Sequence, residues 1–475
     1  MMEKVKYRLR LLVFCSLFLL TRSHCSTDEE PFRLFGEKTF YEHVGGKLPA
    51  IEERAPEYCQ PIHINMLIRH GARYPDPDDS FPALPELFKL ARKINITGTA
   101  TQCPEDIKAL LNWKVWATIY DNGNVTREGA KEMSDLAFRF KQAFPEILNK
   151  DIPANQFWFS STDIPQTRQS LSPFKTEILK NNENQLRTEN RLREAQEVIP
   201  RLEDDQIFSK NCEKYMVRVS RNVSVTPEFK AFLNGPLVEG IVKGVTRRLG
   251  FPKGAIDRFV VWKMYTIGCY YQQWVDNENG PWCAAFTREE LEILSFAEDI
   301  RNYEMKSRKI SISYEKNCFV SKEIMSSLLD SRTKDMLDQP HLAGRFRLVH
   351  TSNIVTTVAN FRLYEVDEPL TSQNFESKRN REFNFAKMVP TAANLVFVLY
   401  RCDDPSLAVD YKVQVLWNEN VVPVPGCPQE GTVGQLCDLD KFMRIYPTFV
   451  VGSLHECDQD EICRLPRSMS FQGHY

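Results

Sequence analysis

The sequence lacks the short motifs that identify several common enzyme classes. It contains no GxxxxGK[ST] phosphate loop, no HExxH zinc helix and no GxSxG nucleophile elbow, so NTPase, metalloprotease and serine-hydrolase functions find no support. None of the 13 cysteines forms a CxxC pair, which argues against zinc-ribbon and thioredoxin-like sites. Low-complexity tracts and fixed-period repeats are also absent. The 475 residues, 42% of them hydrophobic, therefore predict a globular chain with a large core.

The sequence also lacks an excess of positive charge. Its formal net charge is −2, so the chain has no overall attraction to nucleic acid or to an anionic membrane surface. No group of histidines and acidic residues has the spacing of metal ligands, and we expect neither a metal nor a cofactor. A binding site for an anion must therefore be local and concentrated.

Beyond residue 20 no apolar run is long enough to span a bilayer. The mainly apolar run at 11–20 follows a basic segment, residues 4–10, and precedes the small residues Ser23 and Cys25. We interpret residues 1–25 as a secretory signal peptide. The C-terminal residues match neither a KDEL-type retention signal nor a lipid-anchor tail. We therefore expect a secreted protein without a membrane anchor.

Two kinds of covalent modification are expected in a secreted chain. Asn95, Asn124 and Asn222 each begin an N-x-[ST] glycosylation sequence. Eleven cysteines follow the leader residues 1–25, and in an oxidising compartment most of them should form disulfides. Because eleven is an odd number, either one thiol stays free or cleavage before Cys25 leaves twelve.

Short apolar runs and amphipathic stretches alternate along much of the chain. The β-branched run 62–68 predicts a buried strand that ends before Gly71. Apolar residues at helical spacing predict a helix over 127–144, with Thr126 at its N-cap. Further strands are predicted at 155–162, 345–350 and 393–401, and a hairpin joins 411–417 to 421–424.

We predict an α/β fold in which a mostly parallel sheet is flanked by helices and interrupted by a helical insertion lobe. Residues 26–175 and 336–475 would form the two parts of the α/β domain. Charged helical patterns dominate residues 176–335, which we interpret as the mainly helical lobe. Ligands of open α/β sheets bind at the carboxyl ends of the strands, so the two lobes should enclose a cleft there.

The stretch "LIRHGARYP" follows the first predicted strand and concentrates charge in one loop. Arg69 and Arg73 flank His70, and guanidinium groups bind phosphate oxygens through paired hydrogen bonds. Gly71 allows the backbone to approach a ligand closely. A neutral imidazole in such a loop can attack phosphorus and form a phosphohistidine. A basic surface turn is the alternative, but the position directly after a buried strand favours a phosphate site.

The segment "RHGARYP" resembles the RHGxRxP signature of the histidine acid phosphatases at every defined position. Three further segments resemble the multiple inositol polyphosphate phosphatase branch of that superfamily, at 34–44, 127–145 and 367–402. The resemblance covers nearly the whole mature chain and is loosest in the helical lobe. It implies a phytase-like hydrolase of small phosphate esters, with inositol polyphosphates as the expected substrates and no nucleic-acid partner.

The resemblance also implies a role for each residue of the motif. His70 matches the nucleophile, and Arg69 and Arg73 match the arginines that bind the phosphate. Arg168 matches a third arginine downstream, and His350 matches a second histidine that donates to a phosphate oxygen in the transition state. The family pattern further implies a disulfide between Cys59 and Cys402. Two local disulfides are expected beside it, Cys269–Cys283 and Cys427–Cys437.

The sequence departs from the family directly after the second histidine. The superfamily has His-Asp there, or His-Ala-Glu in the inositol phosphatase branch, and the acid protonates the leaving oxygen. This chain has "HTSN", with Thr351 at the Asp position and Ser352 at the Glu position. Neither hydroxyl can replace a carboxylic acid, and loss of a general acid costs about 10²–10⁴ in rate.

Two functions remain open after this departure. The first is a working phosphomonoesterase in which water or another carboxyl group supplies the proton, with Asp367, Glu368 and Glu376 as candidates. The second is a secreted protein that binds inositol phosphates or phosphate and whose catalysis is impaired. We favour the enzyme, because a nucleophile and charge stabilisation supply much of a rate enhancement on their own.

Overall fold

The computed structural model describes residues 32–75, 83–97, 99–113, 123–148, 152–180, 212–269, 280–364, 366–406, 408–427, 433–453 and 456–465. The predicted signal peptide, residues 1–25, lies outside these ranges. Seven strands form one sheet in the order β2-β3-β1-β4-β5-β6, with β7 paired to β5. Their bounds are β1 (Cys59–Arg69), β2 (Phe157–Ser161), β3 (Gly344–Val349), β4 (Asn394–Cys402), β5 (Asp410–Trp417), β6 (Asn420–Val421) and β7 (Cys437–Asp438).

The α/β class is confirmed, but the sheet is mixed and the prediction of a mostly parallel sheet is wrong. Only β2, β3 and β1 are paired in parallel, whereas β4, β5, β6 and β7 are paired antiparallel. The physical reason lies in the connections, because a parallel crossover needs a dozen or more residues. The short segment between β4 and β5 cannot cross over. The turn between β5 and β6 is tighter still, with Asn418 and Glu419 at positive φ.

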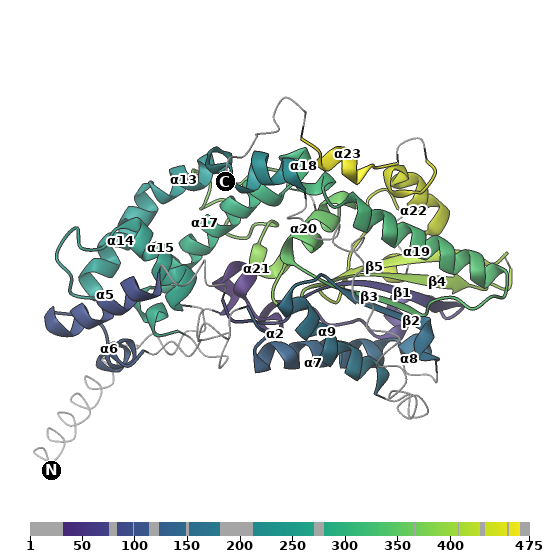
Figure 1. Cartoon of the computed structure of the whole chain (residues 1–475), viewed down its shortest axis with the longest axis horizontal. Helices are drawn as coiled ribbons and strands as arrows, with labels where there is room; N and C mark the ends of the chain where they lie inside the picture. Colours follow the sequence, from purple (N-terminus) through teal and green to yellow (C-terminus); the bar gives the residue numbers. More distant parts are fainter. Residues whose placement is uncertain are drawn as a thin grey trace, which may run out of the picture.

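The central strand β1 faces a separate apolar layer on each side. Ile64, Met66 and Ile68 pack in one core cluster, whereas Leu67 packs in another, because successive side chains of a strand point to opposite faces. Figure 1 shows the helices that cover the two faces. They are α7 (Arg127–Ala143), α8 (Pro145–Leu148) and α9 (Pro165–Leu179) on one side, and α19 (Cys318–Met336), α20 (Thr351–Asn360) and α22 (Leu439–Ile445) on the other.

Helix α7 confirms the pattern predicted from its sequence. The side chain of Thr126 accepts a hydrogen bond from the amide of Gly129 and so caps the helix. The predicted apolar positions are buried, among them Met133, Leu136 and Phe140. This helix therefore begins at a defined point beside the end of β1.

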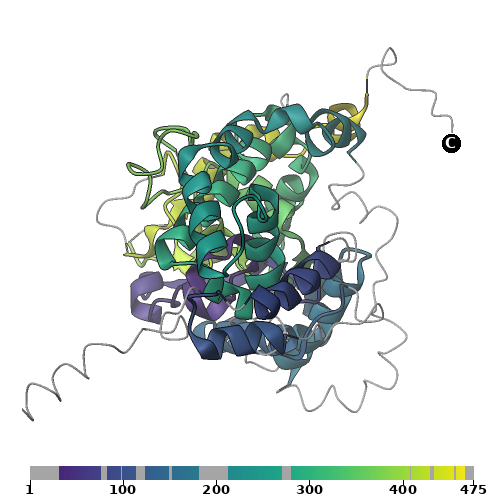
Figure 2. The same ribbon diagram turned by 90° about the vertical axis from the view of Figure 1, so that its left-hand side faces the viewer.

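Between α9 and β3 the described residues form helices and contain no strand. Except for α19, which covers one face of the sheet, these helices lie at one end of the sheet in Figure 1 and face the viewer in Figure 2. Two helices from earlier in the chain, α5 and α6, join them, and Trp113, which follows α6, packs edge to face on Trp282. The division at residues 175 and 335 stays a prediction. The helices are α5 (Leu84–Thr97), α6 (Pro104–Leu111), α12 (Glu213–Tyr215), α13 (Pro227–Leu233), α14 (Pro236–Arg248), α15 (Arg258–Lys263), α17 (Arg288–Lys306) and α18 (Ser311–Glu315).

Disulfides connect segments that are far apart in the sequence. The structure contains the three disulfides expected from the sequence, Cys59–Cys402, Cys269–Cys283 and Cys427–Cys437. Beside Cys59–Cys402, the amide of Asp403 donates a hydrogen bond to the carbonyl of Tyr58 at 2.9 Å. Each cysteine in the described part of the chain is bonded, including Cys103. Within the same residues, no helix has the length and apolar character of a membrane span. The disulfides are Cys59–Cys402, Cys212–Cys463, Cys269–Cys283, Cys318–Cys457 and Cys427–Cys437.

The Cys59–Cys402 disulfide should be a large contributor to stability. It ties β1 to β4 across 343 residues, and a cross-link restricts the unfolded chain more as the loop it closes grows. We expect replacement of both cysteines by serine to lower the free energy of unfolding by about 2–5 kcal/mol. Denaturant unfolding measures this loss.

The matched control is the Cys427–Cys437 pair, whose separation is 10 residues. Its double serine variant should lose less stability because its loop is short. Equal losses from the two pairs would contradict the loop-closure explanation.

Candidate active site

The two histidines predicted to act together lie side by side at the ends of neighbouring strands. β1 and β3 run in parallel with Arg69 opposite Val349, so the residues that follow them, His70 and His350, leave the sheet at the same edge. The amide of His70 donates to the carbonyl of Val349 at 3.1 Å. The centroids of the two imidazole rings are 5.6 Å apart.

His70 is buried, with 4% of its surface exposed. Its Nδ1 lies 2.9 Å from the carbonyl oxygen of Gly71, and because a carbonyl only accepts, Nδ1 carries the proton. The lone pair is therefore on Nε2. Burial, together with the positive charges of Arg69 and Arg73 and the nearby His350, holds the pKa of His70 well below its ordinary value of 6.5. The low pKa favours the neutral imidazole.

Two glycines allow helix α7 to press directly on the loop that carries His70. A Cβ on Gly71 would lie 2.2 Å from the carbonyl oxygen of Gly129, and a Cβ on Gly129 would lie 2.0 Å from that of Ala72. The amide of Gly71 donates to Oγ of Ser170 on α9 at 3.0 Å. Neither glycine can be enlarged without moving the loop.

Arg69 is held by backbone carbonyls and keeps part of its guanidinium unbonded. Its Nη1 donates to the carbonyls of Glu37 and Val389, the latter at 2.7 Å. Its Nε is buried and has no hydrogen-bond partner in the described part of the protein. Burial lowers its pKa to about 10, so the group stays charged at physiological pH. A buried cationic donor without a partner suits an anionic ligand.

Arg73 is half-buried and lies where the loop meets the segment before α7. It forms an isolated β-bridge with Val125, and its Nη1 donates to the carbonyl of Tyr74 at 2.9 Å. The amide of Tyr74 in turn donates to the carbonyl of Asn124 at 2.8 Å. These contacts fix the backbone on both sides of Arg73.

His350 is oriented by a hydroxyl from the third parallel strand. Nε2 of His350 lies 2.9 Å from Oγ1 of Thr162, which follows β2 and also contacts Oγ1 of Thr167 at 2.8 Å. His350 is the N-cap residue of α20, and its amide donates to Oδ1 of Asn353 at 3.2 Å. The positive end of the α20 dipole therefore lies beside the two imidazoles, where an anion is stabilised.

Arg168 lies in the first turn of α9, next to Thr167. Its side chain is 53% exposed and its guanidinium forms an ion pair with Asp163. The structure thus places Arg168 on the helix that also contacts the Gly71 amide through Ser170, but pairs it with a carboxylate. Its phosphate-binding role stays a prediction.

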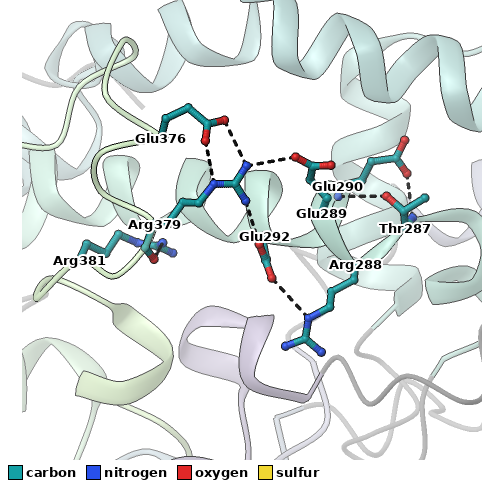
Figure 3. A network of polar contacts seen from close by, with 8 residues as sticks. All are labelled: Thr287, Arg288, Glu289, Glu290, Glu292, Glu376, Arg379 and Arg381. Atoms are coloured by element: carbon teal, nitrogen blue, oxygen red, sulfur yellow. Dashed lines mark hydrogen bonds and ion pairs between the residues drawn. The ribbon is translucent and has the colours of Figure 1, made fainter.

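Two of the three candidate carboxyl groups for the missing proton donor, Glu376 and Glu368, form ion pairs away from the two histidines, and the role of Asp367 stays a prediction. Glu376 forms an ion pair with Arg379, which also contacts Glu289 and Glu292 on α17 (Figure 3). Hydrogen bonding to Arg379 lowers the pKa of Glu376, which disfavours its protonated form. Glu368 is 63% exposed and lies 3.4 Å from the Nζ of Lys378. Ser352 is half-buried in the first turn of α20, where the family has its acid.

Sequence reasoning missed three polar residues that hold the site together: Thr162, Ser170 and Glu132. Thr162 and Ser170 flank Arg168 in the segment "STDIPQTRQS", whose density of hydroxyl groups was the available signal. Glu132 accepts a hydrogen bond from the amide of Ala72 at 2.8 Å. Its only signal was its position one turn after Gly129, at the start of an amphipathic helix.

The contact between the two glycines makes a direct prediction. Gly71→Ala should lower the free energy of unfolding by about 1–3 kcal/mol, as overpacking of a rigid site does, and should displace His70. Gly240→Ala is the matched control, because Gly240 lies in α14 and a Cβ there meets no atom within 4 Å. That change should raise the stability by roughly 0.5–1 kcal/mol. A Gly71→Ala variant as stable as the parent protein would show that the loop and α7 can separate freely.

Comparisons with known proteins agree with this geometry. The family model of the histidine phosphatase superfamily (branch 2) matches residues 62–418. Multiple inositol polyphosphate phosphatase 1 of Homo sapiens is 25% identical over 469 residues, which cover 96% of this chain and 93% of the relative. The protein of the same name from Gallus gallus is 25% identical over 453 residues, 91% and 93% of the two chains.

Solved structures have the same fold. The phytase of D. castellii superimposes with a TM-score of 0.65 at 16% identity, over 94% of this chain and 91% of the phytase. The multiple inositol polyphosphate phosphatase of Bifidobacterium longum, in complex with inositol hexasulfate, has a TM-score of 0.62 at 13% identity, over 89% and 99% of the chains. From the extent of the family match and the site at the ends of β1 and β3, the chain belongs to branch 2 of the histidine phosphatase superfamily.

Proposed function

We propose that this protein is a phosphomonoesterase that hydrolyses inositol polyphosphates through a phosphohistidine on His70. The observation that carries the proposal is the state of His70, a buried neutral imidazole whose Nδ1 is bonded to Gly71 and whose Nε2 lone pair remains available. Curated relatives named multiple inositol polyphosphate phosphatase 1 and phytase A support the substrate class. The bound inositol hexasulfate of the B. longum structure supports it as well.

The chemistry proceeds in two displacements at phosphorus. Nε2 of His70 attacks the phosphoryl group, the P–N bond forms and the P–O ester bond breaks, so that the alcohol leaves. Water then attacks the phosphohistidine, which releases inorganic phosphate and restores the imidazole. Arg69, Arg73 and Arg168 are the proposed phosphate ligands, and His350 with the α20 N-terminus stabilises the charge of the transition state. No cofactor takes part in these two displacements.

The leaving oxygen has no carboxylic acid beside it in the HTSN motif. We infer that water protonates the alkoxide, because Ser352 cannot act as an acid near neutral pH. An inositol-phosphate-binding protein with impaired catalysis is the second candidate function. The absence of the acid favours it, the retained arginines fit both functions, and the retained nucleophile His70 favours the enzyme.

We also propose that the protein acts outside the cell after removal of a signal peptide that ends before Cys25, because Cys103 is disulfide-bonded while the other ten described cysteines pair with one another. The disulfides support an oxidising compartment. Asn222 is exposed and Asn124 is half-buried, which suits them as glycosylation sites, while the side chain of Asn95 lies outside the described residues.

Restoring the acid tests the proposed chemistry. Ser352→Glu should raise the turnover of phytate, an alkyl phosphate, by about 10²-fold or more and leave an activated aryl phosphate nearly unchanged. The reason is that only an alkoxide leaving group needs a proton. Steady-state kinetics on both esters measures the difference.

The control variant is His70→Ala, which should abolish turnover of both esters because no phosphoenzyme can form. A binding protein would show no turnover of either ester and salt-sensitive phytate binding that weakens in Arg73→Ala. Rapid phytate hydrolysis by the unmodified protein, unaffected by Ser352→Glu, would show that another group already supplies the proton.

A further inference from the structure

Glu132 connects three segments of the chain at a single carboxylate. It lies in the second turn of α7, and its Oε2 accepts from the amide of Ala72 at 2.8 Å. Its Oε1 accepts from the amide of Tyr41 at 3.2 Å and from Oγ1 of Thr391 at 2.5 Å. Both oxygens of one side chain are therefore bonded to groups from outside its own helix.

All three segments meet at the loop that carries His70. Ala72 belongs to the loop itself. Thr391 precedes Ala392, whose amide donates to the carbonyl of His70 at 3.1 Å, and Ala393, whose carbonyl accepts from the amide of Arg69 at 2.7 Å. Tyr41 begins the short helix α2 (Tyr41–Val44). Two residues before Tyr41, the carbonyl of Thr39 accepts a hydrogen bond from the amide of Thr391 at 2.9 Å. Glu132 therefore holds the loop directly at Ala72 and also holds Thr391, which precedes the residues bonded to His70 and Arg69.

Burial and hydrogen bonding have opposite effects on the pKa of the Glu132 carboxyl group. Burial raises the pKa of Glu132 to about 7, against the hydrogen bonds from Thr391, Ala72 and Tyr41 and the charge of Arg69, which lower it. The charges of Glu37 and Glu298 raise the pKa of Arg69, and the charge of Arg73 lowers it. Only the ionised carboxylate can accept from all three donors at full strength. The protonated form must direct its O–H to Thr391, because a hydroxyl is the only one of the three partners that can accept.

These contacts give Glu132 a task other than proton donation. Its two oxygens are occupied by backbone amides and a hydroxyl, so the carboxyl group does not reach a leaving group. We propose that Glu132 is a positioning residue that holds the Arg69–Arg73 loop in the geometry required for phosphoryl transfer to His70. This inference rests on the proposed function, since it assigns to Glu132 the alignment of that nucleophile.

The test compares Glu132→Gln with Asp135→Asn, a change on the same helix. Asp135 is 47% exposed and pairs with Lys131 at 2.5 Å, outside the site. Glutamine keeps the shape but places an NH2 group against either the Ala72 or the Tyr41 amide. We expect kcat of Glu132→Gln to fall by about 10- to 100-fold on aryl and inositol phosphates alike, as small misalignments do. KM should stay within a few-fold, and Asp135→Asn should match the parent protein.

Two further measurements separate positioning from general stability. The ratio of parent to Glu132→Gln rates should rise as the pH increases through about 7, because the ionised form acts. Hydrogen exchange of the peptide containing residues 69–73 should be faster in Glu132→Gln than in Asp135→Asn, whether or not the protein turns over substrate. Three results would each overturn the proposal. The first is unchanged hydrogen exchange in this peptide, and the second is a ratio of rates that does not depend on pH. The third is a lower melting temperature of Glu132→Gln with an unchanged kcat. If His70→Ala retains activity, the proposed function itself fails, which the exchange measurement distinguishes from a failure of this inference.

Discussion

The parallel pairing of β1 with β3 is the constraint on which the rest of the site depends. The two strands are far apart in the sequence, and their register places Arg69 opposite Val349. His70 and His350 follow directly after the two strands, so the register brings them together, and their ring centroids lie 5.6 Å apart. A slip by one residue would turn each side chain of β3 to the other face of the sheet. On the other side of β1, the Cys59–Cys402 disulfide fixes its antiparallel register with β4.

The loop after β1 adds a second constraint, because it must be both rigid and positively charged. Burial of Arg69 and His70 is costly unless their polar atoms are satisfied. Carbonyl oxygens of Glu37, Val389 and Gly71 provide much of that satisfaction. The remaining Nε of Arg69 is buried without a partner among the described residues. The same burial keeps His70 neutral, so one physical cause prepares both the anion site and the nucleophile.

The local elements of this site could be predicted from the sequence because their signals are local. The apolar run before Gly71, the cap at Thr126 and the arginines around His70 are all visible within a few neighbouring residues. The antiparallel hairpin of β5 and β6 was predicted, whereas the antiparallel pairing of β4 with β1 was missed because it depends on segments far apart in the sequence. Glu132 and Thr162 were missed for a related reason, since a single polar residue on an amphipathic element has the pattern of a solvated one. Arg168 shows the converse, because its position in a motif does not reveal that it pairs with Asp163.

Trapping the phosphorylated protein would show whether His70 accepts the phosphoryl group. The protein would be mixed with an inositol polyphosphate, quenched within one turnover in alkali, where phosphohistidine is stable, and digested for mass spectrometry. If His70 is the nucleophile, the peptide that contains His70 carries a phosphate and the peptide that contains His350 carries none. Release of inorganic phosphate without a phosphorylated His70, or a phosphate on a different residue, would contradict it.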